Sequence, residues 1–145
     1  MSGSELKLLY IEADDFVRAS VVTLLESLEC AITKATNFKT AINELDSQTP
    51  FDLILLGDIT RPSTSTSIGP KAELTIIAKT RSLYPKTPLL IFTNHNYLPA
   101  AYEYGITAHL LKPADQKAII RFITPHLEIM RPEKTNDKSA SQGSK

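Results

Sequence analysis

Residues 52–58 read DLILLGD, in which four apolar residues, Leu53 to Leu56, are followed by Gly57 and Asp58. A short apolar run bounded by polar or turn residues is typical of a strand that is buried on both faces of a parallel sheet. Four further runs of this kind occur in the chain: Leu6–Ile11, Ala31–Lys34, Leu89–Phe92 and Ala108–Leu111. The sequence therefore predicts five short buried strands.

The segments between these runs have the spacing of amphipathic helices. Apolar residues recur every three or four positions: Val17, Val21, Leu24, Leu25 and Leu28; Phe38, Ala41, Ile42 and Leu45; Leu74, Ile77 and Ala78; Ile119, Ile120 and Ile123. We expect Asn37 and Asp115 to cap the second and the last helix, and Pro125 to kink or end the last helix one residue earlier. Repeated strand–helix alternation predicts a parallel sheet with helices on both faces and a site beyond the carboxyl ends of its strands.

Length and composition exclude several classes of protein. The 145 residues suit one domain, and a hydrophobic content of 42% is enough to build a core. Lys plus Arg and Asp plus Glu each number 16, so the chain lacks the basic surplus of a dedicated nucleic-acid-binding protein. The single cysteine, Cys30, excludes a disulfide framework and a cysteine-based zinc site. No apolar run reaches the about 18 residues of a membrane span, and we expect a soluble, cytoplasmic domain.

The end of the chain differs in composition from the rest. Residues 131–145 contain no large apolar residue, so they can bury too little surface to offset the entropy of ordering. The sequence therefore predicts a domain over residues 5–130, followed by a disordered tail or linker over residues 131–145.

Polar residues follow four of the predicted strands, namely Glu12–Asp15, Gly57–Thr60, Thr93–His95, and Lys112 with Pro113. Together with the stretches EADDFVRASVVTLLE (12–26) and YGITAHLLKP (104–113), this ordered set resembles the CheY-like receiver domain of two-component response regulators. The resemblance covers residues 5–130. It implies a flavodoxin-like, three-layer αβα sandwich with five parallel strands in the order 2-1-3-4-5, and a signalling protein rather than an enzyme.

The family resemblance also implies a site. In receiver domains an acidic cluster binds Mg²⁺, an aspartate ending the third strand accepts a phosphoryl group from a histidine kinase, and Thr or Ser and Lys bind phosphate oxygens. A carboxylate nucleophile beside a metal ion and an ammonium group suits this chemistry. The resemblance assigns Thr93 and Lys112 to the phosphate pocket and His109 to the position of a switching aromatic residue. Structural roles are the alternative: Thr93 ends a strand, Lys112 pairs with Glu12 or an acid after it, and His109 is a partly exposed strand residue.

The first acidic cluster departs from the family pattern. Counting back six residues from Arg18 puts Glu12 at the family's first acid and Ala13 at the second, which is normally a direct metal ligand. Alanine coordinates nothing. Asp14 and Asp15 follow, and they are either metal ligands or part of a solvated turn that caps the first helix.

The third strand departs from the pattern as well. Five residues after Asp52, the phosphoacceptor position falls on Gly57, which has no nucleophile, whereas counting back from Pro62 makes Asp58 the acceptor. A one-residue bulge at Gly57 reconciles the two registers. Without a bulge, the alternation of side chains along a strand directs Asp58 away from the site.

These departures predict an atypical receiver, or pseudo-receiver, that signals by protein–protein contacts without phosphorylation. The alternative is a working receiver phosphorylated on Asp58 by a histidine kinase, with Mg²⁺ bound by Glu12, Asp14 or Asp15, and Asp58. No cofactor is expected otherwise. Expected partners are a histidine kinase, an output protein or a second copy of the chain, with no nucleic acid and no membrane. The expected contact face carries Tyr97, Tyr102, Tyr104, His109 and Phe122. The alternative is that these aromatic residues complete the core around a shortened fourth helix. The Ser/Thr-rich segment Pro62–Pro70 predicts an exposed loop.

Overall fold

The structure is a computed structural model that describes the backbone of residues 5–59, 71–95 and 97–142, and the side chains as far as residue 130. The Ser/Thr-rich segment 62–70 lies outside the described residues.

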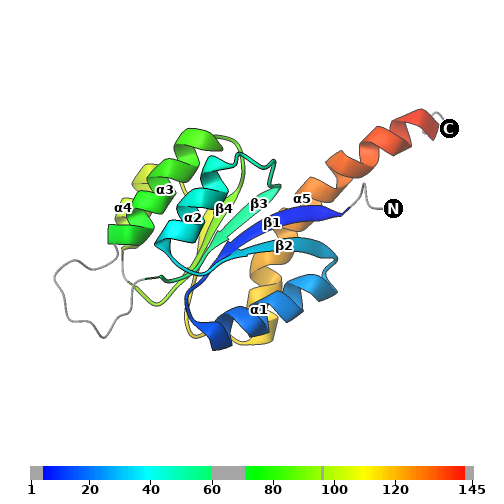
Figure 1. Cartoon of the computed structure of the whole chain (residues 1–145). Coiled ribbons are helices and arrows are strands. Elements are labelled where there is room, and N and C mark those ends of the chain that lie inside the picture. The colour runs from blue at the N-terminus through cyan, green and yellow to red at the C-terminus, as the bar shows by residue number, and fades with distance from the viewer. Residues whose placement is uncertain (1–4, 60–70, 96, 143–145) are drawn as a thin grey trace.

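Five strands form one parallel sheet: β1 (Leu6–Ile11), β2 (Cys30–Ala35), β3 (Leu53–Leu56), β4 (Leu89–Thr93) and β5 (Ala108–Leu111). Their order across the sheet is β2-β1-β3-β4-β5, and each neighbouring pair is parallel (Figure 1). The predicted fold and strand order are confirmed. The predicted bounds hold for β1, β3 and β5, while β2 and β4 are slightly longer than predicted.

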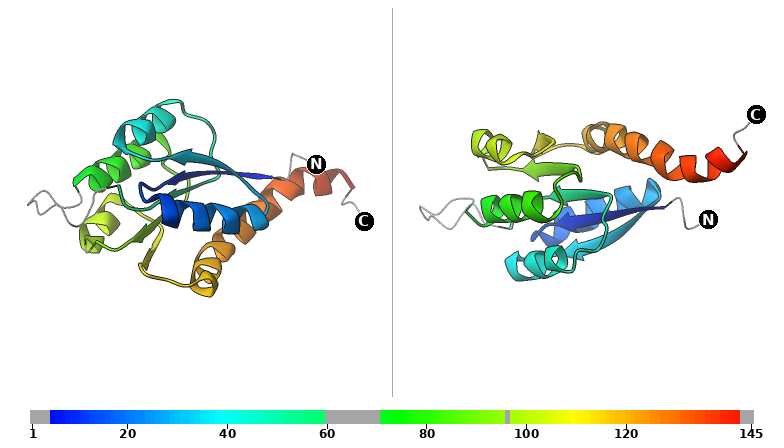
Figure 2. Two further views of the ribbon diagram at one scale, coloured as in Figure 1. Left: turned by 60° about the horizontal axis from the view of Figure 1, so that its bottom comes forward. Right: turned by 90° about the horizontal axis from the view of Figure 1, so that it is seen from above.

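Five helices cover the sheet: α1 (Asp15–Ser27), α2 (Phe38–Asp46), α3 (Lys71–Leu83), α4 (Leu98–Tyr104) and α5 (Gln116–Gln142). Helices α2, α3 and α4 lie on one face and α1 and α5 on the other, as the views in Figures 1 and 2 show. The molecule is therefore the three-layer αβα sandwich that the resemblance implies.

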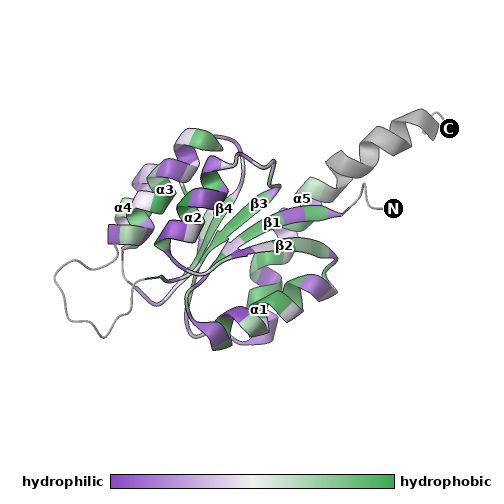
Figure 3. Cartoon of the chain, in the orientation of Figure 1, coloured by the Kyte–Doolittle hydropathy of each residue, from purple (hydrophilic) through white to green (hydrophobic). Residues whose placement is uncertain are grey.

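Alternation along each strand divides the apolar side chains between two cores. The first core packs against α2, α3 and α4 and includes Leu9, Ile11, Ile54, Leu56, Leu89 and Ile91. The second core packs against α1 and α5 and includes Leu6, Leu8, Tyr10, Leu53, Leu55, Leu90 and Phe92. Apolar residues accordingly fill the strands, and polar residues lie on the outer faces of the helices (Figure 3).

Capping side chains fix where three helices begin, and therefore where the loops between strands and helices end. Asn37 caps α2 in a reciprocal capping box with Thr40. The Asp115 carboxylate accepts the Ala118 N–H at 2.8 Å at the start of α5. Both predicted caps are confirmed, and Asp14 caps α1 in the same way.

The last helix differs from its prediction. Pro125 lies inside α5, which continues to Gln142. Of the two predicted effects of Pro125, a helix end is therefore wrong, and a kink stays a prediction. Backbone helix also runs through residues 131–142, where the sequence analysis predicts a disordered tail. Extending an existing helix adds one hydrogen bond for each residue that is fixed, so a helix can continue past the part that packs on the sheet. No helix in the described part of the chain is both long and apolar enough to cross a membrane.

Candidate functional site

Four side chains from four strand ends meet at the carboxyl edge of the sheet. Glu12 follows β1, Asp58 lies just beyond β3, Thr93 ends β4 and Lys112 follows β5. Glu12 and Thr93 have 0% exposure and Asp58 has 7%. The structure thus brings together the residues that the sequence assigned to this edge.

Lys112 joins two buried carboxylates. Its Nζ lies 2.9 Å from Glu12 Oε1 and 3.0 Å from Asp58 Oδ2, and 5.3 Å from the centre of the Phe92 ring. Burial raises the pKa of Glu12 more than the Lys112 charge lowers it. Burial lowers the pKa of Lys112, but the charges of Glu12 and Asp58 outweigh that effect and raise it.

A local change in backbone pairing turns Asp58 toward this site. The Gly57 N–H donates to the Ile11 carbonyl at 2.6 Å, and the Ala13 N–H donates to the Asp58 carbonyl at 3.0 Å. In a regular parallel ladder the second bond would go to the Gly57 carbonyl. Gly57 and Asp58 therefore lie together opposite Glu12, which is the one-residue bulge that reconciles the two registers considered from the sequence.

Gly57 leaves room for the Glu12 carboxylate. A Cβ atom added at Gly57 would lie 1.9 Å from Glu12 Oε1 and 3.1 Å from the Ile11 carbonyl oxygen. Among the described residues, Gly105 is the only glycine with a positive φ, so backbone conformation does not explain the glycine at 57. The available space explains it, because the carboxyl group of Glu12, just after β1, fills the volume that a side chain at position 57 would need.

The two Asp58 oxygens have distinct partners. The Thr93 hydroxyl donates to Oδ1, and the Asn94 N–H donates to Oδ2 at 3.1 Å. The His95 N–H in turn donates to Thr93 Oγ1 at 2.9 Å. Asp58 is thus held from β4 and β5 together, and Thr93 has a role beyond ending its strand.

The acids after Glu12 are directed elsewhere. Asp14 Oδ1 accepts the N–H groups of Phe16 and Val17, both at 2.9 Å, and these bonds lower its pKa. Asp15 pairs with Arg18 at 2.6 Å on the exposed surface of α1. The capping interpretation therefore describes Asp14 better than the metal-ligand interpretation, and Asp15 forms a surface ion pair.

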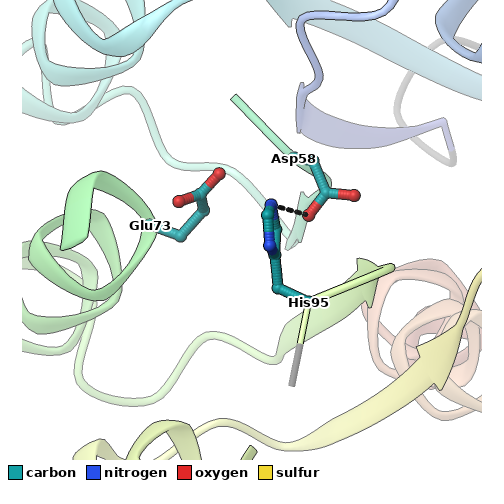
Figure 4. Close-up of side chains that lie close together, drawn as sticks. All are labelled: Asp58, Glu73 and His95. Atoms are coloured by element: carbon teal, nitrogen blue, oxygen red, sulfur yellow. Dashed lines mark ion pairs between the residues drawn. The ribbon is translucent and has the colours of Figure 1, made fainter. Parts of the chain in front are cut away.

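Two polar residues near Asp58 received no role from the sequence. Glu73 of α3 has 0% exposure and its Oε2 accepts the Ile59 N–H at 2.7 Å. His95 Nε2 lies 3.8 Å from Asp58 Oδ1, as Figure 4 shows. The available signal for Glu73 was its spacing, because it precedes buried Ile76 and Ile77 by three and four residues.

The aromatic residues near β5 fall into two groups. Tyr102 and Tyr104 of α4 are 45% and 48% exposed. The Tyr102 hydroxyl lies 2.7 Å from His109 Nδ1 on β5, and Phe122 on α5 is half-buried. Tyr97 is 6% exposed and its ring packs in the first core. For this residue the core alternative is therefore right, and Tyr97 is not part of an exposed contact face.

Solved structures that share this fold are receiver domains of response regulators. A CheY-like response regulator receiver domain protein from Methanospirillum hungatei gives a TM-score of 0.72 at 16% identity, covering 89% of this chain and 98% of that chain. A two-component response regulator from Clostridium difficile gives a TM-score of 0.70 at 23% identity, covering 87% of this chain and 98% of that chain. The chemotaxis response regulator CheY4 of Vibrio cholerae gives a TM-score of 0.68 at 18% identity, covering 84% of this chain and 98% of that chain.

Sequence comparison adds no closer relationship. No protein-family model matches the chain, and no curated protein sequence matches it. At the identities of the structural neighbours, the similarity shows a shared fold.

Proposed function

We propose that the chain is a receiver-type module of two-component signalling that acts through protein–protein contacts and without phosphorylation. One observation carries the proposal. The Glu12 carboxylate fills the space of a side chain at position 57, and Lys112 joins that carboxylate to Asp58. The side chains that correspond to those that receiver domains use for phosphoryl chemistry are here engaged with one another inside the domain, with one ammonium shared by two carboxylates.

The residues present do not fit the magnesium site of the family. Ala13 offers no oxygen ligand, and Asp14 is engaged at the N-terminus of α1. The Lys112 ammonium lies within 3.0 Å of both Glu12 and Asp58, so a cation already occupies the space between these carboxylates. Proteins usually hold Mg²⁺ by one or two carboxylates together with waters, and both buried carboxylates here are already engaged by Lys112.

A second candidate function is a working receiver that is phosphorylated on Asp58. The position of Asp58 favours it, because the side chain lies between Thr93 and Lys112, the two types of group that bind phosphate oxygens in the family. This candidate requires the ion pairs of Lys112 to rearrange when a phosphoryl group arrives.

Treatment with acetyl phosphate and Mg²⁺, followed by intact-protein mass spectrometry, distinguishes the two candidates. We expect no stable gain of one phosphoryl group. Asp58→Asn is the informative variant, and Asp15→Asn, on the exposed surface of α1, is the matched control. A gain in the wild type and in Asp15→Asn that is lost in Asp58→Asn would establish the working receiver instead.

For contacts with a kinase, an output protein or a second copy, we propose the surface of α4 and β5, defined by Tyr102, Tyr104 and His109. Exposed tyrosines supply large contact area at low entropic cost. Light scattering over a concentration series should show weaker self-association for Tyr102→Ala than for the wild type. Phe38→Ala, at a 41% exposed residue of α2, is the control on another surface. Unchanged association across the surface would redirect attention to α1.

A further inference from the structure

Three metal-ligating side chains converge on the α3 side of Asp58. Asp58, Glu73 and His95 each offer one ligand atom, and these atoms all lie within 4.8 Å of one another (Figure 4). They come from three separate parts of the chain: the end of β3, helix α3 and the segment after β4. Asp58 and Glu73 are buried, and the His95 side chain is 13% exposed. We propose that this cluster binds a divalent transition-metal ion, with Zn²⁺ as the best match.

The ligand types and distances fit such an ion. One imidazole nitrogen and two carboxylate oxygens suit Zn²⁺, whereas Mg²⁺ prefers oxygen ligands alone. With bonds of about 2.1 Å, tetrahedral coordination puts ligand atoms about 3.4 Å apart. His95 Nε2 and Asp58 Oδ1 lie 3.8 Å apart. All three ligand atoms lie within 4.8 Å of one another, so side-chain movements of up to about 1.4 Å close the cluster around a metal ion.

Surrounding hydrogen bonds already orient the carboxylates. The Thr93 hydroxyl donates to Asp58 Oδ1, and the Ile59 N–H donates to Glu73 Oε2 at 2.7 Å. Metal-binding carboxylates are commonly held by outer partners of this kind, and those partners tune affinity. Both ligands are thus fixed by backbone or side-chain groups of neighbouring elements.

Tyr97 lies beside the cluster. It is 6% exposed, and its ring centre lies 6.3 Å from that of His95. Its hydroxyl makes no hydrogen bond of regular geometry in the described part of the chain, although the Thr93 side chain is near enough to lower the pKa of Tyr97 in part, against the larger effect of burial. A water on the metal ion would supply a hydrogen bond of good geometry to this buried hydroxyl.

Local charge also favours a cation. The single ammonium of Lys112 is shared between the buried carboxylates of Glu12 and Asp58. One positive charge therefore faces two carboxylates, and Asp58 Oδ1 lies on the side away from the Lys112 contact to Oδ2. The proposal does not depend on which of the two candidate functions is right. The metal ion would bind the unphosphorylated Asp58 and would compete with phosphorylation for this side chain.

Calorimetric titration of chelator-treated full chain with ZnCl₂ tests the site, and Co²⁺ absorption in the visible range reports its coordination. We expect one equivalent to bind, with tetrahedral Co²⁺ bands and a raised melting temperature. MgCl₂ should neither raise the melting temperature nor displace Co²⁺.

His95→Gln and Glu73→Gln should each weaken binding by at least about tenfold. His126→Gln and Glu128→Gln, both on α5, are the matched controls and should bind as the wild type does. Circular dichroism of the metal-free proteins checks that each variant is folded. If Glu73→Gln does not fold, the comparison of His95→Gln with the wild type decides the test. Absence of saturable Zn²⁺ binding to the wild type, or equal affinity in His95→Gln and His126→Gln, would overturn the proposal.

Discussion

Gly57 and Glu12 share a space that holds only one of their two side chains. Gly57→Ala places a Cβ 1.9 Å from Glu12 Oε1, and Glu12 is itself held by Lys112 and by the Asp14 N–H. We expect the substitution to lower the free energy of unfolding by about 1–3 kcal/mol, as overpacking of a buried site does. Urea denaturation measures the change.

A double-mutant cycle shows whether the carboxylate is the cause. In a Glu12→Ala background the two closest contacts of a Cβ at 57, both with the Glu12 carboxyl group, are gone, and the contact with the Ile11 carbonyl oxygen at 3.1 Å remains. The cost of Gly57→Ala should therefore shrink markedly there. An equal cost in both backgrounds would assign the glycine to a backbone requirement instead.

The buried carboxyl of Glu12 makes stability depend on pH in a defined direction. Burial raises its pKa above the ordinary value of 4.5. The folded state then holds the proton more tightly than the unfolded state, so this group costs stability above its folded pKa. As pH falls from there toward 4.5 that cost is relieved.

Glu12→Gln removes this titration while keeping the shape of the side chain. The difference in unfolding free energy, wild type minus Glu12→Gln, should rise as pH falls from 7 to below 4.5. Urea denaturation of both proteins at several pH values measures this difference. The contributions of the other titrating groups, which both proteins share, cancel in it to first order. A difference that falls with decreasing pH would mean that Lys112 dominates and that the pKa of Glu12 is lowered.

Part of the site could be predicted residue by residue from the sequence. The strand-end rule located Glu12, Thr93 and Lys112, because a parallel sheet gathers its carboxyl ends at one edge. Counting alone left Gly57 and Asp58 as alternatives, because a bulge is set by how β1 and β3 pair across distant parts of the chain. Glu73 was missed because its spacing to Ile76 and Ile77 indicates a buried side chain but does not tell which groups it contacts.

At the scale of elements, the strands and caps were predictable and the end of α5 was not. Strand and cap positions follow from local patterns, such as the apolar run of β3 and the Asn37–Thr40 box. Pro125 predicted a helix end from a local rule. Packing on both sides of it overrides that rule, since Ile123 and Leu127 are both buried in the second core.

Removing residues 131–145 tests how much of α5 belongs to the domain. These residues contain no large apolar side chain, and Met130 is the last described side chain that packs against the second core. We expect the truncated chain to lose helical circular dichroism signal while its unfolding free energy changes by less than about 0.5 kcal/mol.

A longer deletion is the control for that truncation. Removing residues 126–145 also takes away Leu127, which is 1% exposed. Loss of such a buried leucine should cost about 2–5 kcal/mol. If the shorter deletion proves as costly as the longer one, the domain extends beyond residue 130.

At the scale of the whole molecule, β3 belongs to both cores. Leu55 faces the second core and Leu56 faces the first, with exposures of 1% and 0%. The resemblance predicted strand order, and order decides that this central strand is covered on both sides. Two cores that share the strands of one sheet should unfold together, since neither keeps its strands when the other opens.

Leu55→Ala and Leu56→Ala test this coupling as a matched pair of neighbouring residues on opposite faces. Each should lower the unfolding free energy by about 2–5 kcal/mol, because each leaves a cavity in a packed core. Tyr10 lies in the second core and Tyr84 in the first, so tyrosine fluorescence samples both, while far-ultraviolet circular dichroism reports the helices. In both variants the fluorescence and circular dichroism signals should show a single unfolding transition, with the same midpoint at a lower urea concentration than in the wild type. If either variant gave two transitions, or moved one signal alone, the two cores would be separate cooperative units. The sheet would then only connect them mechanically, and binding at Asp58 would not stabilise the α1 and α5 side.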